Sequence, residues 1–108
     1  MAESVTDLWE ILVPVKDNTG HEFPVKHHRQ WDDRVREITG GLTIMRTAKG
    51  QWLDHDGELF NEKMIPVRLA CNEKQARKVM DLTLAHYKQL VVMAYRVSDR
   101  VIVTHAGK

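Results

Sequence analysis

The sequence has little cysteine: Cys71 is the only one in 108 residues. A single thiol cannot form a disulfide within the chain, and it cannot build a thiolate metal site alone. A position just before a helix lowers a thiol pKa, but no partner residue is assignable, so we interpret Cys71 as a small buried hydrophobe. We therefore expect a protein of the reducing cytoplasm whose fold depends on neither disulfides nor metal.

A surplus of one charge is also missing, because 16 Lys and Arg residues stand against 15 Asp and Glu residues. Proteins that bind nucleic acid carry a basic surplus, so we expect no nucleic acid partner. No apolar run reaches the roughly 18 residues of a membrane span. The longest candidate, residues 8–15, contains Glu10 and Pro14. We expect neither a membrane segment nor an export signal.

The residues that are present fit an ordinary globular protein. Hydrophobic residues make up 43% of the chain, which suffices for a modest core at this length. No internal composition change suggests a linker. We expect a single domain over residues 1–108.

The most informative stretch is residues 40–71, where two apolar, β-branched runs flank a polar tip. The tip, residues 54–57, ends in the Asp-Gly pair that is typical of tight turns. The stretch predicts a long β-hairpin, kinked or bulged at residues 48–50 because Gly50 interrupts the first arm. The tip resembles a calcium loop only superficially, since the later ligands are missing.

Hydrophobic periodicity and end signals predict the other elements. A helix runs from Pro24 to about Thr39, because Pro suits the first helical position and glycines follow the last turn. A second helix starts at Asn72, where Gln75 completes a variant of the capping box. The expected strands are residues 8–15, 91–97 and 101–105, with a frayed start at 1–6 and a bend or bulge at 98–100.

The order of elements predicts an α+β fold, the ferredoxin-like βαββαβ sandwich, with an antiparallel sheet and two helices on one face. Such a sandwich leaves the other face of the sheet uncovered. The first strand is apolar on both sides, so its second side needs cover, either at Trp9 or at Leu8 and Leu12. A second copy of the chain is the simplest cover, and we expect a homodimer.

Five residues are candidates for lining a pocket. His28 and Trp31 lie near the start of the first helix, Arg46 and Glu62 can meet across the hairpin, and Tyr95 lies on a late strand. Each has a structural alternative: a packed histidine instead of a metal ligand, an ion pair instead of an anion clamp, a buried aromatic instead of a ligand contact. We favour these alternatives, and we expect no metal and no cofactor.

The chain contains Val13-Pro14-Val15-Lys16-Asp17-Asn18-Thr19-Gly20, Gly40-Gly41-Leu42-Thr43, Gly50-Gln51-Trp52, Glu62 and Tyr87-Lys88-Gln89. In these motifs, followed by a closing valine-rich strand, it resembles a family of small uncharacterised bacterial proteins with a ferredoxin-like fold. The match spans nearly the whole chain, from about Leu8 to Val103. The resemblance implies the fold and supplies no catalytic residue. The chain departs from the commoner family pattern at Thr39, where an aromatic residue is usual.

Three functions from different classes remain open, because fold alone does not decide function. The preferred interpretation is a non-enzymatic, dimeric binding or regulatory module that binds a small molecule or a protein partner. The second is a cofactor-independent monooxygenase or isomerase of the dimeric α+β-barrel type, using the five candidate residues. The third is a PII-like small-molecule sensor, a trimer with the hairpin as its signalling loop, although a recognisable phosphate-binding loop is missing.

Overall fold

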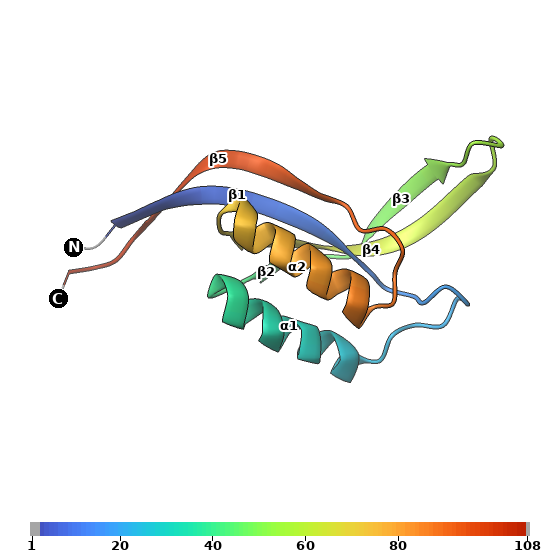
Figure 1. Cartoon of the computed structure of the whole chain (residues 1–108), viewed down its shortest axis with the longest axis horizontal. Coiled ribbons are helices and arrows are strands. Elements are labelled where there is room, and N and C mark those ends of the chain that lie inside the picture. The colour runs from blue at the N-terminus through green and yellow to red at the C-terminus, as the bar shows by residue number, and fades with distance from the viewer. Residues whose placement is uncertain (1–2, 108) are drawn as a thin grey trace.

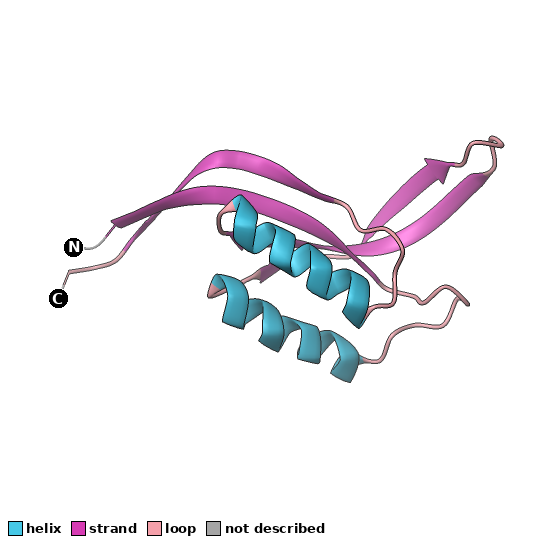
Figure 2. Cartoon of the chain, in the orientation of Figure 1, coloured by secondary structure: helices cyan, strands magenta, loops and turns pink. Residues whose placement is uncertain are grey.

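The computed structural model describes residues 3–107, in which two helices cover one face of an antiparallel sheet (Figures 1 and 2). This arrangement confirms the predicted ferredoxin-like α+β fold. Neither described helix is long and apolar enough to cross a membrane. The elements are β1 (Glu3–Pro14), α1 (Val25–Thr39), β2 (Thr43–Ile44), β3 (Ala48–Leu53), β4 (Leu59–Ala70), α2 (Glu73–His86) and β5 (Ala94–Thr104).

The strand order is β2-β4-β1-β5, and β3 pairs with β4 farther along its length. The predicted hairpin therefore forms, but its first arm breaks at residues 45–47 rather than at 48–50. Pro66 explains the position of the break. The Met45 amide donates to the Pro66 carbonyl at 2.9 Å, and Pro66 has no N–H to return a second bond to the ladder.

Local signals end α1 and begin α2 as predicted. Gly40 adopts a positive φ of 85° after α1, and its amide donates to the Arg36 carbonyl at 2.8 Å. At the start of α2 the Asn72 side chain accepts from the Gln75 amide, and the Gln75 side chain accepts from the Asn72 amide, which completes the capping box.

Two strands differ from their predicted bounds. β1 begins at Glu3, because residues 3–6 pair with the end of β5. The predicted fraying at residues 1–6 is therefore wrong for residues 3–6. Residues 1–2 lie outside the part of the chain that the structure describes. β5 begins at Ala94 instead of residue 91, because residues 87–93 first connect the helix layer to the sheet. The predicted bulge at 98–100 is confirmed as a register shift within one continuous strand.

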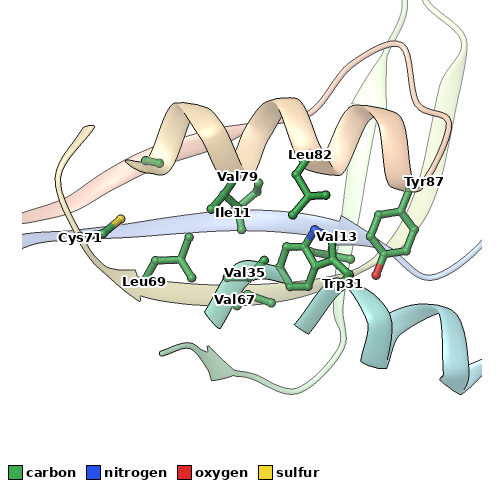
Figure 3. Packing of buried hydrophobic residues seen from close by; sticks show 11 residues of the cluster. Ile11, Val13, Trp31, Val35, Val67, Leu69, Cys71, Val79, Leu82 and Tyr87 are labelled. Atoms are coloured by element: carbon green, nitrogen blue, oxygen red, sulfur yellow. The ribbon is translucent and has the colours of Figure 1, made fainter. Parts of the chain in front are cut away.

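The core lies between the helices and the covered face of the sheet (Figure 3). Trp31 of α1 is 1% exposed, and its Nε1–H donates to the Thr83 hydroxyl of α2 at 3.0 Å. Thr83 in turn donates to the Val79 carbonyl. The indole N–H of Trp31 therefore has a hydrogen-bond partner inside the core, and this bond joins α1 to α2.

The molecule is elongated, with extents of 55 × 29 × 23 Å. Its radius of gyration is 15.5 Å, against about 13 Å for a compact domain of this size. Two ribbons account for the length (Figure 1). The hairpin ribbon consists of β3 and residues 59–64 of β4, and the terminal ribbon at the opposite end consists of residues 3–6 of β1 with residues 101–104 of β5.

Candidate functional site

The face of the sheet that points away from the helices, the helix-free face, carries alternate residues of its strands. In β1 these are the even-numbered residues 8–14, and the cross-strand registers place their partners on the same face. Leu8 and Leu12 are only half-buried there. The partners are Met64, Pro66, Arg68 and Ala70 of β4, and Tyr95 and Ser98 of β5.

A charged cluster occupies the middle of the helix-free face. Glu10 lies directly between Arg68 and Tyr95 in the two registers and is 7% exposed. The Arg68 Nε–H donates to Glu10 Oε1 at 2.9 Å, and the Tyr95 hydroxyl donates to Glu10 Oε2. We call these three residues the Glu10 cluster. A buried carboxylate in the centre of a sheet is stable only when it is paired in this way.

The protonation states in the cluster follow from these contacts. Burial pushes the pKa of Glu10 upward, but the hydrogen bonds from Tyr95 and Arg68 and the Arg68 charge outweigh it, so the pKa lies below its usual value. The hydrogen bond to Glu10 and burial both raise the pKa of Tyr95. At neutral pH the cluster therefore holds a carboxylate, a guanidinium and a neutral phenol.

Beside the cluster lies a hollow of about 520 Å³. We call it the apolar hollow, because most of its walls are hydrophobic. It is bounded by β1, the hairpin ribbon and the segment 89–93 that leads to β5. Glu62 and Asp54 are the charged groups in its lining. The apolar lining residues are Leu12, Pro14, Trp52, Leu53, Phe60, Met64, Leu90, Val91, Val92 and Met93.

Gly50 shapes one wall of this hollow. A Cβ at this position would collide with the Cε of Met64 and would lie 3.2 Å from Nε1 of Trp52. Gly50 pairs directly with Glu62 across the hairpin. The glycine that the sequence marked as a strand break therefore allows Met64 and Trp52 to pack closely.

The structure separates the five predicted pocket residues. Glu62 lines the apolar hollow, and Tyr95 belongs to the Glu10 cluster on the same face. Trp31 is a core residue and His28 lies between the helices, so neither reaches that face. Arg46 is exposed in the link between β2 and β3. Within residues 3–107 it forms no ion pair with Glu62, because the register places Gly50 opposite Glu62.

His28 is part of a histidine cluster that joins the two helices. The His27 Nε2–H donates to the His86 carbonyl and the His86 Nε2–H donates to the His27 carbonyl, both at 2.7 Å. The two rings stack at 3.9 Å. His28 Nδ1 lies 2.7 Å from the Tyr87 hydroxyl. Burial lowers the pKa of His28 and of His86, and it raises the pKa of Tyr87, so these groups are neutral at pH 7.

These histidines are packed, as the structural alternative for His28 predicts. In the described part of the chain, no three His, Cys, Asp or Glu side chains are grouped so that they could hold a metal ion. Cys71 is 2% exposed, and burial followed by the nearby Asp7 charge raises its pKa to about 11. A thiol with this pKa is protonated and unreactive at neutral pH.

Sequence reasoning named Tyr95 as a candidate, but it missed Glu10 and Arg68 and the contacts that join all three across the sheet. Arg68 meets Glu10 over 58 positions of sequence, and Tyr95 meets it over 85. One signal was available: Glu10 is the single charge in the predicted, otherwise apolar strand of residues 8–15, and such a residue needs a partner on a neighbouring strand.

No family model matches this sequence, and a search of curated proteins finds no match. Solved structures share the fold. A phage SAM lyase in complex with S-methyl-5'-thioadenosine is 12% identical with a TM-score of 0.65, over 93% of this chain and 90% of that chain. The periplasmic divalent cation tolerance protein CutA from Archaeoglobus fulgidus is 10% identical with a TM-score of 0.62, over 87% and 82%. The divalent ion tolerance protein CutA1 from Ehrlichia chaffeensis is 10% identical with a TM-score of 0.60, over 99% and 88%.

Proposed function

We propose that this protein is a self-associating, small-molecule-binding module, dimeric and cytoplasmic, whose ligand occupies the apolar hollow while a second copy covers the helix-free face. The observation that carries the proposal is the hollow itself. It combines apolar walls with a few polar groups, on the one face of the sheet that the chain's own helices leave open. Sites for small organic molecules have this composition and this range of volume.

The polar groups of the hollow restrict the ligand. Glu62 and Asp54 are acidic, Asn18 and Gln89 are neutral, and the lining of the apolar hollow contains no Lys or Arg among the described residues. Trp52 and Phe60 form a cross-strand pair that offers aromatic surface. A ring system can stack on this surface and place a hydrogen-bond donor or a cation toward the carboxylates.

Exposed apolar side chains support self-association. Leu90 is 94% exposed and Val91 is 80% exposed at the rim of the hollow, and Leu53 at the hairpin ribbon is 70% exposed. Single exposed leucines are ordinary, but a group of them around one hollow is typical of an interface. A second copy presents the same apolar residues, so two copies can bury them reciprocally.

The structural neighbours supply a first probe. The phage SAM lyase has this fold and carries S-methyl-5'-thioadenosine, a small molecule with an aromatic base and an apolar thioether. The CutA proteins are named for tolerance of divalent cations. The acidic and aromatic lining of the hollow suits the first kind of molecule, and we choose S-methyl-5'-thioadenosine for the test.

A second candidate function is a cofactor-independent enzyme, of the monooxygenase or isomerase kind, acting at the same hollow. The Glu10 cluster favours it, because its carboxylate and phenol have pKa values shifted by specific contacts. Glu10 lies two residues from Leu12, which lines the hollow. Conversion of a bound molecule, lost in Glu10→Gln with binding retained, would identify an enzyme.

Sedimentation and calorimetry together test the proposal. We expect a mass of two chains in solution, and saturable heat with S-methyl-5'-thioadenosine that Trp52→Ala abolishes. Leu53→Asp should shift the assembly toward the monomer. The matched control is Val25→Asp, because Val25 is 64% exposed but lies on the helix layer. A monomer at all concentrations contradicts the assembly, whereas a trimer supports the PII-like alternative.

A further inference from the structure

Two histidines join the helices at one end, and each caps the backbone of the other. We call His27 of α1 and His86 of α2 the histidine clamp. The Nε2–H of each ring donates to the backbone carbonyl of the other residue at 2.7 Å, and the ring centroids lie 3.9 Å apart. The His86 carbonyl belongs to the last turn of α2, where carbonyls have no partner within the helix. His27 therefore supplies a hydrogen bond that α2 lacks by itself.

The end of α2 leads directly into one wall of the apolar hollow. The Gln89 amide donates to the Leu84 carbonyl at 3.0 Å. The Lys88 amide donates to the Ala85 carbonyl at 3.4 Å, which completes a Schellman motif. Lys88 has a positive φ of 52°, a conformation that favours glycine over lysine. Residues 89–93 follow at once and all line the hollow, so the position of this wall depends on the last turn of α2.

The wall has little packing of its own. Val92 packs against the core, but Leu90 is 94% exposed and Val91 is 80% exposed. At the far end the Met93 carbonyl accepts from a β1 amide at 3.1 Å. A segment with so few buried contacts opens locally at a low cost in free energy. Residues 89–93 are therefore placed mainly by their two ends, and the histidine clamp holds the α2 end against α1.

A second proton on the clamp is unfavourable. One proton leaves both hydrogen bonds intact, because each ring still donates through its Nε2–H. Two protons place two positive charges on stacked rings, and like charges at this distance repel each other. In residues 3–107 no carboxylate lies within 4.0 Å of a His27 or His86 nitrogen. Tyr87 packs edge-on against both rings and is neutral, because burial raises its pKa.

The other charged and titratable groups at this end of the helices act in the same direction. Burial lowers the pKa of His86, the hydrogen bond with the His27 backbone opposes this shift, and the charges of His27 and Arg34 lower the pKa further. Burial lowers the pKa of His28 too, and the nearby Asp32 opposes that shift. Positive charge is therefore disfavoured at the clamp, which holds with one proton or none and opens with two.

We infer that the histidine clamp makes ligand binding in the apolar hollow dependent on pH. When both rings carry a proton, the last turn of α2 separates from α1 and residues 89–93 lose their fixed position. His27 and His86 are positioning residues, since neither lines the hollow and both act on the ligand through its wall. The inference rests on the proposed function for the ligand, whereas the movement of the wall is a property of the free protein.

Nuclear magnetic resonance of the free protein between pH 7.5 and 5.0 tests the movement. We expect the methyl resonances of Val91, Val92 and Met93 to shift below pH 6.5, in step with the second protonation that the ring resonances report. The methyl resonances of Val35 in the core should stay in place, which separates local opening from unfolding. Wall resonances that do not move while both rings titrate would overturn the inference.

Glutamine variants separate the charge of the clamp from its hydrogen bonds. Glutamine keeps an N–H donor for the facing carbonyl and stays uncharged, so His86→Gln and His27→Gln should each keep the wall resonances unchanged down to pH 5.0. His105→Gln, at an exposed position after β5, is the matched control and should shift as the wild type does. Equal shifts in His86→Gln and the wild type would overturn the role of the clamp.

Calorimetry with S-methyl-5'-thioadenosine at the two pH values tests the link to the ligand. We expect binding about tenfold weaker at pH 5.0 in the wild type, and equal binding at both pH values in His86→Gln. That variant retains Glu62 and Asp54, so its result separates the clamp from the carboxylates of the hollow. A wall that moves, without binding at either pH, would contradict the proposed function alone. Equal binding by the wild type at both pH values would contradict the pH link alone.

Discussion

The two sides of β1 face different surroundings. Ile11 and Val13 point toward the helices and are each 1% exposed. On the other side Leu8 and Leu12 are half-buried, and between them Glu10 is held by Arg68 and Tyr95. A strand that is apolar on both sides in sequence thus has one side closed by its own chain and one side that needs a further partner.

This difference separates the part of the molecule that stabilises the fold from the part available for function. The covered side gains free energy from close packing and from a satisfied tryptophan N–H. The helix-free side contains an ion pair, which adds little net stability because desolvation opposes it. We therefore expect substitutions on the two sides to differ in stability and in binding.

The largest expected difference is between two tryptophans. Trp31→Ala should lower the free energy of unfolding by about 3–5 kcal/mol, because it leaves a cavity in the core. It also removes the donor to Thr83. Urea denaturation measures the loss. Trp52→Ala is the control on the helix-free side, where the side chain is 38% exposed, and it should cost less than about 1 kcal/mol. Equal losses would contradict the distinction between the sides.

Glu10→Gln should have an intermediate effect. The amide keeps an acceptor for Arg68 but removes the charge that balances it, so we expect a loss of about 1–2 kcal/mol in urea denaturation. Arg36 and Asp33 form an exposed ion pair on α1, and Asp33→Asn as a control should change stability by less than about 0.5 kcal/mol. A Glu10→Gln variant as stable as the wild type, or more stable, would show that the Glu10 charge does not stabilise the fold.

The pH dependence of stability should come from the histidines between the two helices. Burial holds the pKa of His28 and of His86 below the usual 6.5, so the unfolded chain binds more protons than the native state as pH falls. Their contribution to stability is present above pH 6.5 and is lost below it. Urea midpoints between pH 7.5 and 5.5 measure the slope. His86→Gln should reduce the slope of the urea midpoint against pH, and His55→Gln, at an exposed position, should not. A midpoint that rises toward pH 5.5 would contradict the claim that these buried histidines cause the pH dependence.

The smallest expected effect on stability is that of Gly50→Ala. The new methyl group must displace the Met64 methyl, which lies at the end of a flexible side chain, and it also meets the Trp52 ring at 3.2 Å. Stability should therefore fall by less than about 1 kcal/mol. The resonance of the Met64 methyl should nevertheless shift. Gly41→Ala is the control, because a Cβ there meets no atom within 4 Å. A Met64 resonance that is identical in both variants would contradict the described wall of the hollow.

Local signals in the sequence were sufficient for much of the fold. The Asp-Gly turn, Gly40 and the Asn72 capping box act within a few residues, so they can be recognised without the structure. The Glu10 cluster and the apolar hollow could not be predicted in the same way. They depend on the registers of β1 with β4 and β5, and on the path of residues 89–93, which no local pattern encodes.

Hydrogen exchange at low and high protein concentration tests the central claim most directly, namely that a partner completes the helix-free face. We predict that association protects the amides of residues 51–62 and 89–95, which border the apolar hollow, and leaves those of α1 unchanged. Protection that appears on α1 instead, or no protection at any concentration, would contradict the account.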